Sequence, residues 1–213
     1  MNKQLELDKI AKEIENCAIC KINKSGLPVP GEGNPDADII FIGEAPGKKE
    51  ATTGRPFIGR SGQLLRSMIR EVGLKEEDVF ITSPVKYLPD GPDGTPGGTP
   101  SSSDIAHGRI HLMKQFEIIQ PKVVMLLGRV AAEGVLQKKV FVVTEHGQVI
   151  AHSAGHSTLR DEPSDSDSKS SGSAKLDGVK YFLTVHPAAA LRFPNKYKPM
   201  IRDDFEKLKQ IIA

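Results

Sequence analysis

Residues 43–65, GEAPGKKEATTGRPFIGRSGQLL, combine acids, cations and an aromatic ring in one loop-like segment. Glu44 and Glu50 are carboxylates suited to acid–base chemistry, and Phe57 offers a flat ring. Five glycines and two prolines disfavour regular structure, and the segment follows Ile39–Ile42, a short β-branched run that predicts a buried strand. Because open α/β sheets place their sites in loops at the carboxyl ends of strands, we predict an active site here.

A histidine occupies the corresponding place after the last predicted strand. His186-Pro187 directly follows the apolar run at residues 180–185. If both strands are parallel, His186 lies at the same sheet edge as Glu44. An imidazole there can act as a general acid or hydrogen-bond donor. The alternative is a histidine that only caps the turn before Pro187.

Cations gather around this loop, although the chain as a whole is nearly neutral. The formal net charge of +2 over 213 residues indicates no particular partner by itself. Residues 45–70, however, hold six Lys or Arg against one acid, and residues 192–198 add three cations without an acid. This pattern favours a polyanionic substrate, the alternative being a solvated charged face. The DNA-contact candidates are Lys48, Arg55, Arg60 and Arg192.

Two cysteines and two histidines have the spacing of a metal site. Cys17-x2-Cys20 and His107-x3-His111 together match a closed tetrahedral zinc site, since the histidines share one face of a predicted helix. An iron–sulfur cluster with two histidine ligands is an alternative. A third is that the site holds no metal, with ordinary buried thiols and solvated histidines. Either metal would be structural, and none is needed for the chemistry.

Strands and helices are predicted to alternate along the chain. Strands are expected at residues 38–43, 79–82, 123–127 and 180–185, with a small hairpin at 141–143 and 148–151. Helices are expected at residues 5–20, 61–72, 103–119, 131–136 and 199–212. This alternation predicts one α/β domain over residues 1–213, a three-layer α/β/α sandwich with a four-stranded, mainly parallel central sheet. Residues 161–177 are polar and of low complexity, which predicts a flexible insertion.

Composition excludes some classes of protein. No 18-residue apolar run is present, so no membrane partner is expected. The charged N-terminus lacks the apolar core of a secretion signal, and the Cys-x2-Cys pair suits a reducing compartment. We therefore expect a cytoplasmic protein, and a monomer.

Four segments together resemble the uracil-DNA glycosylase superfamily, specifically its family 4, the iron–sulfur type. They are GEGNPDADIIFIGEAPG (31–47), TGRPFIGRSGQLL (53–65), PKVVMLLGRVA (121–131) and VHPAAALR (185–192). The resemblance covers nearly the whole chain except residues 161–177. It implies a monofunctional enzyme that flips uracil, or a related deaminated base, out of DNA and hydrolyses its N-glycosidic bond, the first step of base-excision repair.

The resemblance also implies residue roles. Glu44 and Glu50 would help position the water and the sugar. His186 would donate to uracil O2 as the bond breaks, which localises the developing charge in the manner of an oxyanion hole. Arg192 would enter from the minor-groove side, and Phe57 would stack on the extruded base. The expected substrate-binding residues are Gly43, Ala45, Phe57 and Ser83.

The chain departs from the family pattern at three positions. Ser83 stands where the family normally carries Asn, and a hydroxyl cannot span two atoms of the uracil edge as an amide does. We therefore expect weaker uracil selectivity or a different deaminated base. Tyr87 and about Gly108 stand where the third and fourth cluster cysteines fall, so an all-cysteine cluster is not expected.

These departures keep a second class of function open, a nucleic-acid-binding module that has the fold without the catalysis. A phosphate-ester hydrolase is the weakest alternative, because no metal-binding cluster of carboxylates is visible in the sequence.

Overall fold

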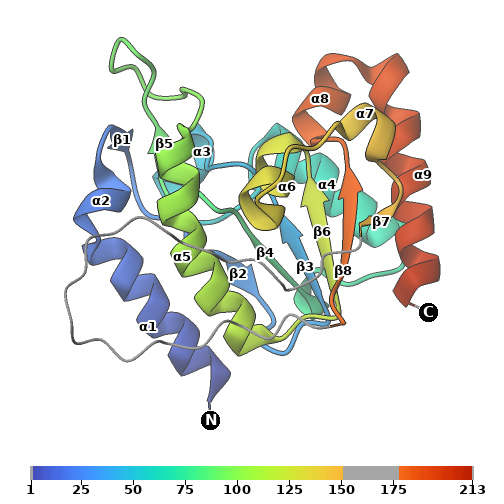
Figure 1. Ribbon diagram of the computed structural model, residues 1–213, viewed down its shortest axis with the longest axis horizontal. Helices are drawn as coiled ribbons and strands as arrows, with labels where there is room; N and C mark the ends of the chain where they lie inside the picture. The colour runs from blue at the N-terminus through green and yellow to red at the C-terminus, as the bar shows by residue number, and fades with distance from the viewer. Residues whose placement is uncertain (1, 151–177, 213) are drawn as a thin grey trace.

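The computed structural model describes residues 2–150 and 178–212, and the insertion predicted at residues 161–177 lies outside them. A six-stranded sheet forms its centre, in the order β2-β4-β3-β6-β8-β7 (Figure 1). The strands are β2 (Glu32–Gly33), β3 (Ile39–Ile42), β4 (Val79–Thr82), β6 (Val123–Leu127), β7 (Val149–Ile150) and β8 (Lys180–Thr184). The four central strands run parallel, whereas β2 and β7 pair antiparallel at the two edges.

The four predicted strands are therefore confirmed as the parallel centre of the sheet. The predicted number of strands is wrong, because the sheet has six. Both additional strands are two residues long. No apolar alternation marks β2, whereas β7 lies within the strand expected at residues 148–151. The hairpin predicted from residues 141–143 and 148–151 is wrong in its first strand and in its pairing, whereas its second strand exists as β7. Val142–Glu145 forms the short helix α7, and β7 pairs with β8 instead. The backbone N–H groups of Thr144 and Glu145 both donate to the carbonyl of Phe141, which closes that helical turn.

Helices cover both faces of the sheet, which confirms the predicted three-layer sandwich. One face carries α1 (Lys3–Asn16), α5 (Ser102–Ile119) and α6 (Arg129–Leu136). The other carries α4 (Arg60–Glu71), α8 (Pro187–Arg192) and α9 (Pro194–Ile212). Figure 1 shows α5 and α6 in front of the sheet and α4 behind it. Successive residues of each strand enter opposite cores, as the pleat requires.

Several helix boundaries differ from the prediction. The predicted N-terminal helix is two helices, because Cys17 is extended (φ −74°, ψ 111°) and separates α1 from α2 (Ala18–Lys21). Helix α5 begins with a capping box that Ser101 forms with Asp104. Helix α9 begins at Pro194, so Pro199 lies inside it.

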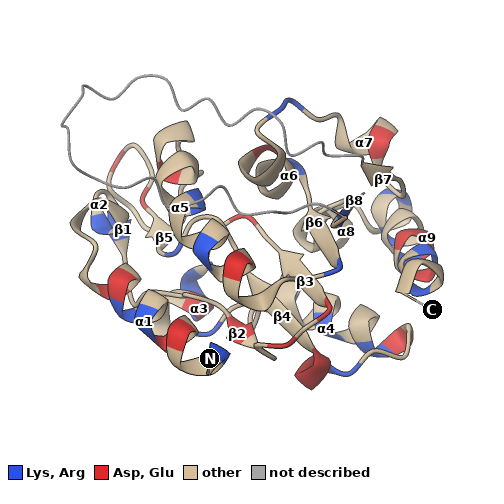
Figure 2. Cartoon of the chain, turned by 60° about the horizontal axis from the view of Figure 1, so that its bottom comes forward, with Lys and Arg blue, Asp and Glu red and all other residues tan. Residues whose placement is uncertain are grey.

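Two short elements lie near the sheet edge where the parallel strands end. They are α3 (Lys48–Thr53) and a two-stranded ribbon of β1 (Lys24–Ser25) and β5 (Leu88–Pro89). The 3-10 helix η1 (Glu76–Asp78) immediately precedes β4 and therefore lies at the opposite edge. Acidic and basic residues are interspersed along α1 and α9 (Figure 2). Among the described residues, no helix has the length and apolarity needed to cross a bilayer.

Candidate active site

A pocket of about 800 Å³ opens at the carboxyl edge of the sheet. The segments that follow β3, β4 and β8 all contribute to it, as expected where parallel strands end. The predicted site residues that line it are Glu44, Ala45, Lys48, Glu50, Phe57, Arg60, Ser83, His186 and Arg192. Two others do not line it, Gly43 and Arg55.

Gly43 and Arg55 are used elsewhere. The ring of Phe57 lies against Gly43 so closely that a Cβ there would stand 2.4 Å from its Cζ. Gly43 therefore leaves the space in which the Phe57 ring packs and does not itself line the pocket. Arg55 is exposed and forms an ion pair with Glu32, with 2.8 Å between Nε and Oε2. Its charge is already countered by a carboxylate of the same chain.

His186 and Phe57 face each other in the pocket, with ring centroids 6.2 Å apart. His186 is the N-cap of α8, and its Nδ1 accepts the backbone N–H of Ala188 at 3.2 Å. A neutral imidazole in this arrangement carries its proton on Nε2, which can donate to a ligand. Burial lowers the pKa of His186 to about 4, so the ring is neutral at physiological pH. The two roles considered for His186, capping the turn before Pro187 and donating a hydrogen bond at the sheet edge, are therefore compatible.

Glu44 stands beside this pair with its carboxylate available. It is half-buried, and within the described chain no residue donates a hydrogen bond to it. Burial raises the pKa of the Glu44 carboxyl above its ordinary value, and the nearby Arg129 guanidinium opposes part of that rise. The carboxylate can therefore take up a ligand or a water molecule without first leaving another partner.

Ser83 is 5% exposed and lines the pocket with its donor already used. Its hydroxyl donates to the backbone carbonyl of Val85 at 2.7 Å. The oxygen lone pairs remain, so Ser83 can accept a hydrogen bond from a ligand but has no second proton to give.

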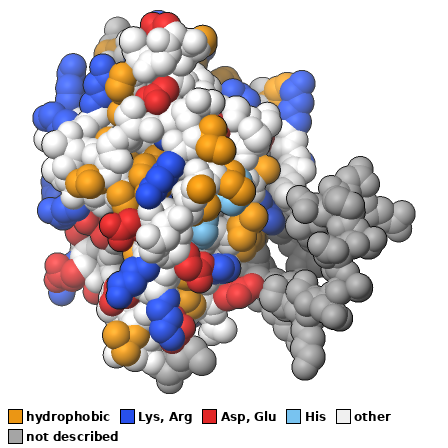
Figure 3. Space-filling view, turned by 90° about the vertical axis from the view of Figure 1, so that its left-hand side faces the viewer, with side chains coloured by type: hydrophobic (Ala, Val, Ile, Leu, Met, Phe, Trp, Pro, Cys, Tyr) orange, Lys and Arg blue, Asp and Glu red, His pale blue; other side chains and the backbone are white. Residues whose placement is uncertain are grey.

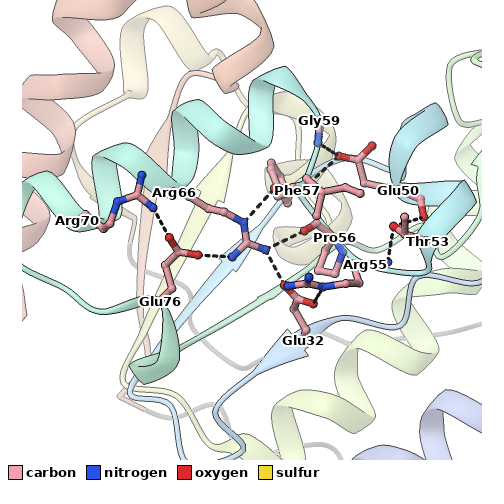
Figure 4. Close-up of polar contacts among 11 residues, drawn as sticks. Glu32, Glu50, Thr53, Arg55, Pro56, Phe57, Gly59, Arg66, Arg70 and Glu76 are labelled. Atoms are coloured by element: carbon pink, nitrogen blue, oxygen red, sulfur yellow. Dashed lines mark hydrogen bonds and ion pairs between the residues drawn. The ribbon is translucent and has the colours of Figure 1, made fainter.

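Glu50 is 8% exposed and is engaged by its own loop. Its Oε1 accepts the backbone N–H of Ile58 at 3.0 Å and that of Gly59 at 2.8 Å (Figure 4). These bonds span the turn that follows Phe57, and Glu50 lies on α3 at the start of the segment. The carboxylate thus ties the two ends of the loop together.

The sequence interpretation missed Arg66, whose guanidinium holds the other side of the same loop. Its Nε donates to the carbonyl of Phe57 and its Nη2 to that of Pro56, both at 3.0 Å. In the sequence, Arg66 is only one of the six cations of residues 45–70. Its partners Glu32 and Glu76 lie 34 and 10 residues away, so no local pattern distinguished it from its exposed neighbours.

The cations of residues 45–70, together with Arg192, divide into two groups. Arg55, Arg66 and Arg70 form ion pairs with Glu32 or Glu76. The exposed cations on the pocket wall, which form no ion pair within the described chain, are Lys48, Lys49, Arg60 and Arg192. This second group is the positive surface that a polyanion can reach.

The four predicted metal ligands come together away from this pocket. Their ligand atoms all lie within 4.8 Å of one another, and none of the four residues lines the active-site pocket. Cys17 is the N-cap of α2 and Cys20 lies in that helix, whereas His107 and His111 lie in α5. Figure 3 shows histidine at the centre of this side of the molecule, bordered by hydrophobic side chains.

The histidines of this cluster are prepared for a ligand. His111 is buried, yet neither ring nitrogen has a hydrogen-bond partner among the described residues. Burial, reinforced by the charge of Lys86, lowers the pKa of His111 to about 4, and a neutral imidazole is the form that binds metal. His107 Nε2 lies 3.1 Å from Cys17 Sγ. The donor set therefore fits a metal ion, and an orphaned buried imidazole is explained by one.

Tyr87 and Gly108 stand where the family resemblance places the third and fourth cluster cysteines, which this chain lacks. Tyr87 is 3% exposed and packs in a small core with Ile10 and Ile14, with its hydroxyl directed to the carbonyl of Ile14. A Cβ on Gly108 would stand 2.0 Å from the carbonyl oxygen of Pro84. Neither position can supply a metal ligand.

Comparison with known proteins agrees with this geometry. The model of the uracil DNA glycosylase superfamily matches residues 30–210. A type-4 uracil-DNA glycosylase of Sulfurisphaera tokodaii is 36% identical over 207 residues, 96% of this chain and 84% of the relative. Those of Thermotoga maritima and Archaeoglobus fulgidus are 33% and 34% identical, over 97% and 94% of this chain and 94% and 88% of the relatives. The chain therefore belongs to the uracil DNA glycosylase superfamily.

Proposed function

We propose that this chain is a monofunctional uracil-DNA glycosylase, which hydrolyses the N-glycosidic bond of a uracil flipped out of DNA and leaves an abasic site. The observation that carries the proposal is the convergence of Glu44, Phe57 and a neutral His186 on one pocket. The similarity to enzymes named type-4 uracil-DNA glycosylase over nearly the full length supports the same activity. A non-catalytic binding module does not need this constellation.

Each of the three residues has a separate task in this mechanism. The flat ring of Phe57 stacks on the extruded base. His186 Nε2–H donates to O2 of the base while the bond between N1 and C1′ breaks and its electron pair moves to the base. Glu44 orients the water whose oxygen forms the new bond to C1′, and the proton of that water passes to the carboxylate and then to solvent. Glu50 was predicted to share this chemistry, and we assign it to holding the loop.

Lysine chemistry is not part of the proposal. Lys48 and Lys49 are exposed on the pocket wall, where ammonium groups suit contacts with phosphate. An enzyme of the lyase type would need a lysine that attacks C1′ and forms a Schiff base. We therefore expect cleavage of the DNA strand only after alkali treatment.

A labelled duplex with one U·G pair tests the function directly. Incubation with protein followed by alkali is expected to break the labelled strand at the uracil, while a matched C·G duplex stays intact. His186→Ala is the matched control variant, with lower cleavage and retained duplex binding. Binding of duplexes with uracil, hypoxanthine or xanthine without any breakage would refute the enzyme and favour the binding module.

The same panel of bases tests selectivity. Ser83 offers an acceptor and no donor, so we propose that it pairs with N3–H of uracil and leaves O4 unread by this side chain. The enzyme is then expected to discriminate less strictly between uracil and other deaminated bases than one with an amide at this position. We further propose that the chain acts as a monomer, since one chain supplies the whole pocket, and light scattering of the purified protein tests this.

We propose that the Cys17, Cys20, His107 and His111 group holds a single zinc ion with a structural role, connecting α2 to α5. Bonds of about 2.0–2.3 Å to one tetrahedral ion place the ligand atoms roughly 3.3–3.8 Å apart. The four ligand atoms, all within 4.8 Å of one another, reach that geometry by small side-chain shifts. An iron–sulfur cluster spreads its ligands over several irons, whereas Cys17 Sγ and His107 Nε2 lie 3.1 Å apart.

Elemental analysis of protein purified without chelator tests the metal. The expected result is one zinc per chain, no acid-labile sulfide and no visible absorbance. Replacement by Co²⁺ is expected to produce the d–d absorption bands of tetrahedral coordination, and His111→Ala to abolish them. Iron with stoichiometric sulfide, or protein that binds no metal, would contradict the zinc proposal and leave the glycosylase proposal unaffected.

A further inference from the structure

The backbone of Phe57 adopts an unusual conformation. Its φ of 52° lies in the left-handed region, which bulky side chains rarely occupy. Among the described non-glycine residues, three others share this feature, Asn23, Gln120 and Gln137. Gln120 and Gln137 are C-caps of helices, where the left-handed conformation is ordinary, and asparagine tolerates it. Phe57 has neither explanation, so other contacts must hold it.

Arg66 binds the carbonyl oxygens of the two peptide groups that flank this residue. The guanidinium donates to the carbonyls of Pro56 and Phe57, and it forms ion pairs with Glu32 at 2.6 Å and Glu76 at 2.5 Å (Figure 4). All three of its nitrogens are therefore in use. Its side chain is 15% exposed, so the hydrogen bonds to the carbonyls are largely shielded from water.

Glu50 holds the peptide groups on the C-terminal side. Its Oε1 accepts the backbone N–H groups of Ile58 and Gly59. Helix α4 also approaches closely, because a Cβ at Gly62 would stand 2.0 Å from the carbonyl carbon of Phe57. The strained residue is thus fixed from two directions by side chains that belong to α3 and α4.

We infer that Arg66 and Glu50 are positioning residues that together hold the ring of Phe57 in the orientation that stacks on the flipped base. The inference rests on the proposed function, because the ring needs a fixed orientation only if a planar ligand binds against it. A side chain held in a strained conformation persists when its surroundings over-determine it, and such strain gathers at functional sites. Here the surroundings are these two side chains.

A double-mutant cycle with Phe57 tests Arg66. Arg66→Gln is expected to lower the single-turnover excision rate about 10-fold or more, within the range that loss of one base–aromatic stack produces. In a Phe57→Ala background the same change is expected to cost less than about 2-fold, because the ring through which Arg66 acts is absent. Equal losses in both backgrounds would overturn the inference. Arg70→Gln is the matched control, since Arg70 shares Glu76 with Arg66 but touches neither carbonyl.

Glu50 is tested by a pair of substitutions that separate positioning from acid–base chemistry. Glu50→Gln keeps an oxygen that can accept both backbone N–H groups, so excision is expected to stay within about 3-fold of the parent. Glu50→Ala leaves those donors without a partner and is expected to lose at least about 10-fold. An equal loss in both variants would assign Glu50 to the chemistry and overturn its positioning role.

A readout independent of activity uses the absence of tryptophan from this chain. Phe57→Trp introduces a single tryptophan at the pocket, whose emission can be excited selectively at long wavelength, and free uracil is expected to quench it. Adding Arg66→Gln is expected to shift the emission to the red and to weaken the quenching, whereas adding Arg70→Gln leaves both unchanged. Emission unaffected by Arg66→Gln would contradict the inference. If the parent protein leaves uracil in DNA, the proposed function fails. The response of the emission maximum to Arg66→Gln still decides whether Arg66 fixes the orientation of the side chain at position 57.

Discussion

The imidazole of His186 and the ring of Phe57 meet in one pocket, their planes inclined by 36°. One residue follows β8 and the other lies in the loop between α3 and α4. The donor nitrogen and the stacking surface are thus fixed by separate parts of the fold, and each can be changed without removing the other.

His186→Ala is expected to reduce single-turnover uracil excision about 10²- to 10³-fold, the usual cost of removing one donor to a developing negative charge. Duplex affinity is expected to change little, because the charge on the departing base exists only in the transition state. Rapid-quench kinetics and a binding titration on the same U·G duplex measure the two quantities. Parallel losses of rate and affinity would show that His186 binds rather than catalyses.

The pH dependence is expected to follow Glu44. Burial raises the pKa of this carboxyl above its ordinary value of 4.5, and the proposed mechanism needs the ionised form. The excision rate should therefore be constant near neutral pH and should fall with decreasing pH at a higher pH than an ordinary glutamate would give. His186, with a pKa of about 4, is protonated only at still lower pH. Glu44→Gln is expected to excise uracil more slowly and to lose this fall of the rate at low pH. If the fall persists in Glu44→Gln, the titrating group is another residue.

Ser83→Asn is expected to sharpen selectivity for uracil. An amide offers both an acceptor and donors, whereas the serine hydroxyl already donates to the carbonyl of Val85. The ratio of excision rates for uracil and hypoxanthine measures the change, and Ser83→Ala provides the comparison without any polar group. A ratio that Ser83→Asn leaves unaltered would mean that this position does not read the base.

Salt dependence tests the cationic pocket wall. Each phosphate that a cation neutralises contributes a slope of about −0.9 to log affinity against log salt. Lys48→Gln combined with Arg192→Gln is expected to reduce the slope by about 1.8 if each contacts one phosphate. Lys12→Gln on α1, far along the chain from this wall, is the control and should change nothing. A slope equal in all three proteins would place the DNA on another surface.

Asp204 connects the strand that precedes His186 to helix α9. The carboxylate is fully buried and accepts hydrogen bonds from Thr184 Oγ1 at 2.5 Å and His146 Nδ1 at 2.9 Å. Asp204→Ala is expected to lower the free energy of unfolding by about 1–3 kcal/mol, since the buried Thr184 hydroxyl is left without an acceptor. Denaturant unfolding measures this loss. Asp203→Ala, at the exposed neighbouring position, should remain within about 0.5 kcal/mol of the parent.

Much of this molecule could be predicted from its sequence, because the necessary signals are local. Apolar runs located all four parallel strands, and their alternation with helical patterns indicated a three-layer sandwich. The carboxyl-edge rule for parallel strands was enough to place Glu44 and His186 together. The pairing of two cysteines with two histidines followed from their spacing and from the resemblance, which places the histidines on either side of a lost cluster cysteine.

Other features depended on contacts between residues distant in sequence, which only the folded chain creates. The edge strand β2 exists through pairing with β4, and its two residues carry no local strand pattern. A strand was expected where β7 lies, but its pairing with β8 depends on the folded chain. Arg66 is a positioning residue and not another DNA-facing cation, because folding brings Glu32 and Glu76 to its guanidinium. Sequence determines which groups are present and which elements carry them. Tertiary structure decides which donor meets which acceptor, and thereby which charges remain available for a ligand.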